Sequence, residues 1–253
     1  MPGPPDPGRI RAVLLDIEGT TTPIDFVTRV LFPYARERVR DFLARRASEV
    51  RDDLALLFSE HEADERAGRS PPAWRRESPP GVLDSAAAYV HWLMDRDRKS
   101  TALKALQGRI WEEGYDTGQL RGQVYPDVPR AFARWRGQGR EIAIFSSGSV
   151  LAQKLLFSKS EAGDLTPYLR AYFDTTTGPK REAESYRKIA RALGREVPSV
   201  LFLSDVPAEL DAARHAGMAT ALCVREGNPP LPTTHPVIQT FDEVDSQQST
   251  VDS

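Results

Sequence analysis

Short apolar runs that stop abruptly at polar residues constrain the fold of this chain more than any other feature. Four of these runs cover residues 12–15, 142–145, 171–173 and 200–203. The residues directly after them are Asp16, Ser146, Asp174 and Ser204. A fifth apolar run covers residues 221–224. Continuous apolar runs, unlike alternating ones, are typical of strands buried on both faces of a parallel sheet. The runs therefore predict a sheet that helices cover on both sides.

Helical spacing between the runs supports this prediction. Apolar residues recur at intervals of three and four over 186–193, and Gly194 follows as a C-cap. A second helix is predicted from Pro207 to His215, with Gly217 closing it. Strands that alternate with helices indicate an α/β fold with a doubly wound, mainly parallel, Rossmann-like sheet. In such sheets, ligands bind at the carboxyl ends of the strands.

Residues 25–120 break the alternation, because every strong pattern there is helical. Pro33 can start one helix, and apolar spacing over 103–110 marks another. Between them, the proline- and arginine-rich stretch 62–84 is predicted to be a surface loop. We therefore predict an inserted all-helical domain. The expected organisation is a disordered leader at 1–8, a discontinuous core at 9–24 and 121–242, the insertion at 25–120, and a flexible tail at 243–253.

Composition narrows the function further. The 253 residues include 34 Lys plus Arg and 36 Asp plus Glu, so the near-neutral chain gives no general electrostatic case for a nucleic-acid or anionic-membrane partner. The sequence has no apolar run of the ~18 residues that a membrane span needs, and its first residues do not have a secretory-signal pattern. Cys223 is the sole cysteine, which rules out an intrachain disulfide and favours a reducing cytoplasm.

Two segments at predicted strand ends can carry chemistry. Asp16 begins "DIEGTTTP", where it can act as a nucleophile or a metal ligand, or cap its own turn. Asp205 follows the fourth run, and with Asp16 it can supply the one or two carboxylates that Mg²⁺ typically takes from a protein. An acid at a helix N-terminus is also explained by the helix dipole, and we interpret Asp211 as structural.

Two further segments can bind phosphate. Ser146 and Ser147 follow the second run, where hydroxyl and amide groups at a helix entrance hold phosphate oxygens or simply cap the helix. Lys180 is either a point charge for a phosphoryl group and an ionised aspartate, or a solvated loop residue. All of these candidates would converge at one edge of one sheet, which favours the functional alternatives.

These residues, in this order, resemble the haloacid dehalogenase-like phosphohydrolases. That family has an aspartate nucleophile, a serine or threonine, a lysine and a final acidic motif, and the helical insertion resembles its cap. The blocks "LLDIEGTTTPI", "LQGRIWEEGYDTGQLRGQVYPDV", "SSGSVLAQKLLF", "FDTTTGPKREAESY" and "SDVPAELDAARHAG" are similar to the narrower family of acireductone synthases, the enolase-phosphatases of methionine salvage. Glu18 fits this narrower family, whereas Asp25 and Glu226 depart from its pattern.

The resemblance implies a two-step reaction on 2,3-diketo-5-methylthiopentyl-1-phosphate: enolisation, then loss of phosphate to give 1,2-dihydroxy-3-keto-5-methylthiopentene. It implies one Mg²⁺ per subunit, held by Asp16, Asp205 and the backbone carbonyl of Glu18. Asp16 is then the nucleophile, and the phosphate ligands are Ser146, Ser147 and Lys180. The sequence does not identify the base that removes the proton during enolisation, and we hypothesise that it is Glu18. The resemblance also implies a monomer whose insertion closes over the substrate, where apolar residues near Trp111 and Tyr115 either meet the methylthio end or pack within the insertion.

Two alternatives remain open. The first is a general Mg²⁺-dependent phosphomonoesterase or phosphotransferase with the same fold, which would release phosphate without an enol intermediate. The second is a non-enzymatic phosphoacceptor module, because receiver-like domains also place aspartates and a lysine at strand ends. The long helical insertion disfavours the second alternative, because a receiver is a single domain with short connections.

Overall fold

The computed structural model describes residues 8–98, 100–227 and 232–244. Its described residues divide into two compact units: the chain up to Phe26 together with Arg121 onward, and Val27–Leu120. The predicted leader except Gly8, and most of the predicted tail, lie outside the described residues. Within the described ranges, no helix is both long enough and apolar enough to cross a membrane.

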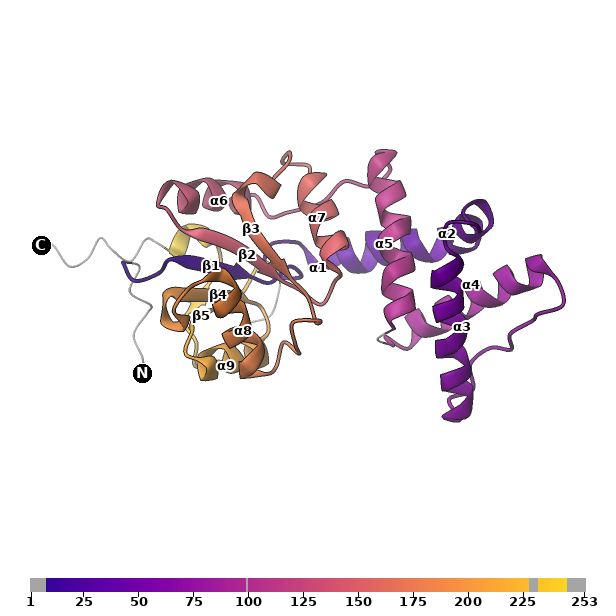
Figure 1. Cartoon of the computed structure of the whole chain (residues 1–253). Helices are drawn as coiled ribbons and strands as arrows, with labels where there is room; N and C mark the ends of the chain where they lie inside the picture. The colour runs from indigo at the N-terminus through magenta and orange to yellow at the C-terminus, as the bar shows by residue number, and fades with distance from the viewer. Residues whose placement is uncertain (1–7, 99, 228–231, 245–253) are drawn as a thin grey trace, which may run out of the picture. The chain divides into compact units, whose positions relative to one another are not determined.

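The first unit contains a six-stranded, all-parallel sheet in the order β3-β2-β1-β4-β5-β6 (Figure 1). The strands are β1 (Ala12–Leu15), β2 (Glu141–Phe145), β3 (Leu169–Phe173), β4 (Val200–Ser204), β5 (Ala219–Cys223) and β6 (Val237–Ile238). The α/β fold class predicted from the sequence is confirmed. The fifth strand begins two residues before the predicted run, and β6 was not predicted, because two residues are too few to form a pattern.

Helices cover both faces of this sheet, with α6 and α7 on one side and α8 and α9 on the other (Figure 1). Their bounds are α6 (Asp127–Gly137), α7 (Val150–Ser158), α8 (Ala183–Leu193) and α9 (Pro207–Ala216). Short 3-10 turns are η2 (Thr166–Tyr168), η3 (Val197–Ser199) and η4 (Phe241–Val244). Gly194 and Gly217 follow α8 and α9 with φ of +65° and +103°, so both predicted C-caps are confirmed.

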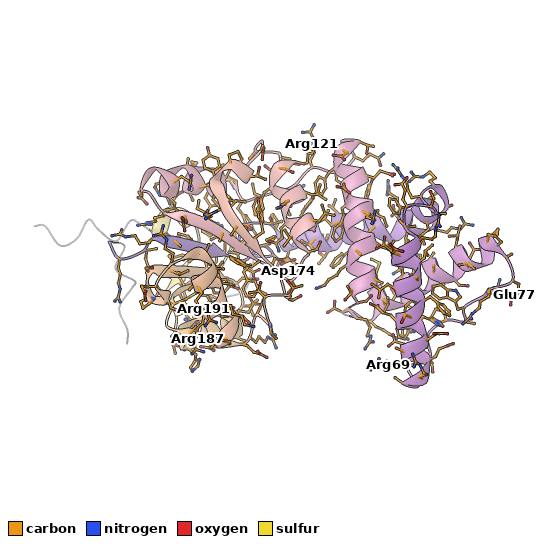
Figure 2. All side chains as sticks on the ribbon, in the orientation of Figure 1. Arg69, Glu77, Arg121, Asp174, Arg187 and Arg191 are labelled. Atoms are coloured by element: carbon orange, nitrogen blue, oxygen red, sulfur yellow. The ribbon has the colours of Figure 1, made fainter. Side chains whose placement is uncertain are left out.

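Burial on both faces explains why the strands read as continuous apolar runs. Ala12 and Leu14 point to the core beneath α8 and α9, where they meet Tyr186 and Leu210, while the intervening Val13 is also fully buried. On α8 the opposite face is polar: Arg187 and Arg191, labelled in Figure 2, pair with Glu184 at 3.4 and 2.5 Å.

In the second unit, helices are the only regular secondary structure among the described residues. A π-helical turn η1 (Val27–Leu31) leads into α2 (Phe32–Arg45), α3 (Arg51–Arg66), α4 (Pro79–Asp95) and α5 (Thr101–Asp116), while the short α1 (Ile24–Phe26) ends the segment before it. Helix α2 packs against α4 and α5, and α3 packs against α5. Trp111 and Tyr115 are buried on α5, and the indole Nε1 of Trp111 donates to the carbonyl of Leu31 at 2.8 Å.

The predicted surface loop 62–84 is wrong at both ends. Glu62–Arg66 continues α3, and Pro79–Asp84 already belongs to α4. Ser78 caps α4 by accepting a hydrogen bond from the Gly81 amide at 3.3 Å, and the two prolines in the first turn lack amide hydrogens that a helix leaves unpaired there anyway. Pro79 and Pro80 therefore mark a helix start, whereas Pro71 and Pro72 do lie between the two helices.

Candidate active site

Asp16 lies directly after β1, the strand flanked by β2 and β4. The residue is 2% exposed, and its Oδ1 accepts a hydrogen bond from the Ile17 amide at 2.8 Å. The chain then turns tightly, because the amides of Thr20, Thr21 and Thr22 all donate to the Ile17 carbonyl at 2.9 to 3.1 Å. Asp16 thus has a fixed orientation at the carboxyl edge of the sheet.

Lys180 contacts Asp16 directly. Its Nζ lies 2.7 Å from Asp16 Oδ1 and 2.7 Å from Glu209 Oε2, and the lysine is only 7% exposed. The Tyr186 hydroxyl donates to the Lys180 carbonyl at 2.6 Å and so ties the loop to α8. The alternative of a solvated loop lysine is therefore wrong.

Sequence reasoning missed two members of this cluster, Glu209 and Ser204. The Ser204 hydroxyl lies 3.1 Å from Asp16 Oδ2 and 3.3 Å from Glu209 Oε2, and it can donate to either carboxylate. Glu209 stands four residues after Asp205 in the first turn of α9, a spacing that could have indicated it. Asp211 instead pairs with Arg214 at 2.6 Å and His235 at 3.1 Å, as expected of a structural residue.

Asp205 lies against the turn that follows Asp16. A Cβ placed on Gly19 would come within 2.1 Å of Asp205 Oδ2, and Gly19 has a φ of +69°. Only glycine tolerates both the left-handed backbone and the close approach of the carboxylate. The absent side chain therefore lets the acids of two adjacent strands meet at one edge of the sheet.

Burial and mutual repulsion shift the pKa values of these acids. Burial, and then the charge of Asp16, raise the pKa of Asp205 to about 7 and that of Glu209 to about 7. The same two causes raise the pKa of Glu18. Burial by itself would lower the pKa of Lys180, but attraction to Asp16 and Glu209 outweighs it, and the pKa of the ammonium is raised. Negative charge is in excess in this part of the described structure.

The two predicted phosphate serines lie after β2, the neighbour of β1. Ser146 is buried, and its Oγ accepts from the Gly148 amide at 3.0 Å, whereas Ser147 is exposed. Ser149, not either of these, caps α7 by accepting from the Ala152 amide at 3.3 Å. Gln153 also supports this loop, because its amide donates to the Gly148 carbonyl at 2.9 Å. Neither Ser146 nor Ser147 is therefore the N-cap of α7, because Ser149 has that role.

The donors at this edge fit Mg²⁺. Asp16, Asp205 and the Glu18 carbonyl offer hard oxygen ligands, and a divalent cation would offset the repulsion that raises the pKa of Asp205. Among the described residues, no three His, Cys, Asp or Glu side chains form a metal cluster. Mg²⁺ does not need one, because it usually takes one or two carboxylates together with water and substrate phosphate.

Comparison with known proteins agrees with this geometry. A family model for haloacid dehalogenase-like hydrolases matches residues 10–217, so this chain belongs to that family. The Enolase-phosphatase E1 of Synechococcus elongatus is 57% identical over 226 residues, which cover 88% of this chain and 92% of that protein. Its counterpart in Cronobacter sakazakii is 46% identical over 239 residues, which cover 94% and 98%. Within the family, the chain therefore groups with the enolase-phosphatases, as the sequence blocks predicted.

Solved structures agree with this fold. The UTR4 protein of Saccharomyces cerevisiae has 36% sequence identity and a TM-score of 0.74, and the match covers 92% of this chain and 99% of that one. The putative hydrolase YfnB of Bacillus subtilis, described as bound to magnesium, has 13% identity and a TM-score of 0.56, and it therefore shows the fold alone.

Proposed function

We propose that this protein is the bifunctional enolase-phosphatase of methionine salvage, which converts 2,3-diketo-5-methylthiopentyl-1-phosphate to 1,2-dihydroxy-3-keto-5-methylthiopentene and phosphate. The observation that carries the proposal is the contact between Asp16 and Lys180, beside Asp205, in a chain that is 57% identical to a relative named Enolase-phosphatase E1. We further propose that the protein works as a monomer in the cytoplasm, with a small phosphorylated diketone as its partner and no nucleic acid or membrane.

Mg²⁺ would be held by Asp16, Asp205 and the Glu18 carbonyl, one ion per subunit. When bound, it supplies positive charge that lets a carboxylate approach a phosphate and that stabilises an enediolate. Lys180 Nζ lies 2.7 Å from Asp16 Oδ1 and neutralises its charge, and we assign Lys180, Ser146 and Ser147 as ligands of the substrate phosphate.

Asp16 carries the phosphatase step. One of its oxygens attacks phosphorus, forming an aspartyl phosphate while the bond from phosphorus to the enol oxygen breaks; the electron pair leaves with that oxygen, which takes up a proton from solvent to give the hydroxyl of the product. Water then attacks phosphorus and loses a proton, the bond between phosphorus and the Asp16 oxygen breaks, the carboxylate is regenerated, and inorganic phosphate is released. The contacts of Asp16 with Lys180, Ile17 and Ser204 orient the carboxylate for both displacements.

Glu18 is the proposed base of the enolase step. It would take a proton from the carbon that bears the phosphate, the electron pair would form the carbon–carbon double bond, and the adjacent carbonyl oxygen would be protonated. Glu18 lies two residues from the nucleophile, and burial raises its pKa, which makes its carboxylate a stronger base. The helical unit Val27–Leu120 is the proposed cap that limits water during this step.

Two variants separate the steps. In Asp16→Asn we expect phosphate release to fall by at least about a thousandfold, the scale for loss of a nucleophile. In Glu18→Gln we expect proton exchange at the reacting carbon in deuterated water to be lost, while hydrolysis of an aryl phosphate, which needs no enolisation, persists. Enol absorbance, inorganic phosphate and deuterium incorporation are the three measurements.

Asp211→Asn is the matched control, because Asp211 pairs with Arg214 and His235 outside the cluster and its loss should leave both rates intact. Wild-type phosphate release by Asp16→Asn would refute the nucleophile, and unchanged exchange in Glu18→Gln would refute the base. Phosphate release by the wild type without any enol signal would favour a general phosphomonoesterase, and a long-lived acyl phosphate would favour a phosphoacceptor module.

A further inference from the structure

A buried arginine holds the turn that carries Glu18. Arg225 follows β5, is 3% exposed, and directs both Nε and Nη2 at the carbonyl oxygen of Thr20, at 2.9 and 2.6 Å. Its remaining nitrogen, Nη1, donates to Asp127 Oδ2 at 2.7 Å and to the Gln239 carbonyl at 3.2 Å. One edge of the guanidinium thus binds the turn, and the other edge is anchored elsewhere in the same unit.

The anchor is rigid. Asp127 begins α6, is buried, and also accepts a hydrogen bond from the Phe241 amide at 2.6 Å. The rings of Tyr125 and Phe241 each lie 4.4 Å from the guanidinium carbon. The Tyr125 amide in turn donates to the Thr21 carbonyl at 3.0 Å, next to the carbonyl that Arg225 holds. The carboxylate and the two rings fix the plane of the guanidinium and therefore the position of Thr20.

The charge of Arg225 is matched by Asp127, so the acids at the sheet edge are neutralised chiefly by other groups, Lys180 among them. What Arg225 determines is geometry. Thr20 adjoins Gly19, whose backbone faces Asp205, and stands two residues after Glu18. A shift of the Thr20 carbonyl would move the Glu18 carbonyl and the Gly19–Asp205 contact together.

We infer that Arg225, anchored by Asp127, is a positioning residue that sets the geometry of the Asp16–Thr20 turn for binding of Mg²⁺ and for turnover. This inference rests on the proposed function, because it takes the turn to be the metal-binding segment. A lysine at this position would keep the charge but could not place two donors on one carbonyl while a third binds Asp127.

The test compares Arg225→Lys with Arg214→Lys, a matched control whose arginine pairs with Asp211 away from the turn. Mg²⁺ binding is measured by titration calorimetry without substrate, and kcat and KM are measured for both products. Changes to groups that orient metal ligands typically weaken metal affinity or activity about 10- to 100-fold. We expect an effect of that size on the Mg²⁺ dissociation constant and kcat of Arg225→Lys, with little change in KM and none in the control.

Thermal unfolding separates positioning from simple stability. A folded Arg225→Lys variant with a lower Tm but wild-type Mg²⁺ affinity and kcat overturns the inference. If Arg225→Lys does not unfold cooperatively, Asp127→Asn is tested in its place, because this change weakens the anchor of the guanidinium while keeping its contacts with Thr20. Unchanged Mg²⁺ binding in Asp127→Asn also overturns the inference. If the wild-type protein binds no Mg²⁺, the proposed function is overturned as well. If the wild type binds Mg²⁺ and turns over substrate, and Arg225→Lys does so equally well, only the role of Arg225 is overturned.

Discussion

At the scale of single residues, the site depends on a side chain that is missing. The backbone of Gly19, with its φ of +69°, leaves the space that Asp205 Oδ2 fills. A methyl group on residue 19 would clash with the carboxylate of Asp205, which directly follows β4, so either the turn or Asp205 would have to move.

We therefore expect Gly19→Ala to reduce both activity and stability. The left-handed backbone costs an alanine about 1 kcal/mol, and displacement of Asp205 should lower turnover by about 10- to 100-fold. Gly194→Ala is the matched control, because Gly194 has a similar φ of +65° and nothing within 4 Å of an added Cβ. Steady-state kinetics and thermal unfolding of both variants check this: equal activity losses in the two would show that backbone strain, and not the Asp205 contact, is responsible.

Some site residues could be predicted from the sequence and others could not. The difference lies in whether a local pattern or the tertiary packing places the residue at the site. Asp16 and Asp205 directly follow buried strands, so the strand pattern alone places them at the edge of the sheet. The position of the Glu209 side chain depends on how α9 is rotated about its own axis, which the sequence does not show. Arg225 depends on the packing of three distant segments around one guanidinium, and no local pattern distinguishes it from an exposed arginine.

At the scale of elements, a buried aspartate ties helix α3 to α4. Asp64 on α3 accepts from the Tyr89 hydroxyl on α4 at 2.8 Å, and from Arg69 and Arg98 at 2.5 and 2.7 Å. Arg69, labelled in Figure 2, lies just past the end of α3. The predicted surface loop 62–84 missed this contact, because a run of polar residues does not show which of them turns inward.

We expect Asp64→Asn to destabilise the protein by about 2 kcal/mol at pH 7, the scale of hydrogen bonds to charged groups. Burial would raise the pKa of Asp64, but its hydrogen bonds from Arg69 and Tyr89 and the charge of Arg98 lower it overall. Because the folded pKa lies below the unfolded value of about 3.9, this stabilisation is complete above that value and is lost as the pH falls through the folded pKa. The difference from wild type should therefore shrink in strong acid.

Denaturant unfolding from pH 7 down to pH 2.5 measures this dependence. Asp95→Asn is the control, since its pair with Arg36, at 2.7 Å, is exposed and such pairs contribute about 0 to 1 kcal/mol. If the difference in unfolding free energy between wild type and Asp64→Asn stays constant across this range, then packing, and not the carboxylate charge, joins the two helices.

At the scale of the whole molecule, we expect stability to depend on Mg²⁺, because acids are in excess at the sheet edge. An ion that binds only the folded state stabilises it by about 2.7 kcal/mol at a hundred times its dissociation constant. We expect Mg²⁺ to raise Tm in a saturable way, chelation to reverse the effect, and Asp205→Asn to abolish most of it. Calorimetric scans against NaCl of equal ionic strength are the measurement; a rise that NaCl reproduces would indicate general screening.

The sheet was predictable at this scale, and the second unit less so. Strands buried on both faces leave a continuous apolar signature, whereas the helices of Val27–Leu120 have amphipathic patterns that show each helix but not which neighbours it packs against. The role of this unit as a cap thus stays a prediction.

The central place of β1 has a consequence for how the protein is made. Ala12 pairs with Glu141 on one side and with Val200 on the other. A ribosome releases β1 before either partner, because the whole unit Val27–Leu120 is translated between β1 and β2, and β4 follows later still. Until then both edges of a wholly apolar strand are open to pairing with other nascent chains, and this enzyme should need protection from aggregation during synthesis more than after it.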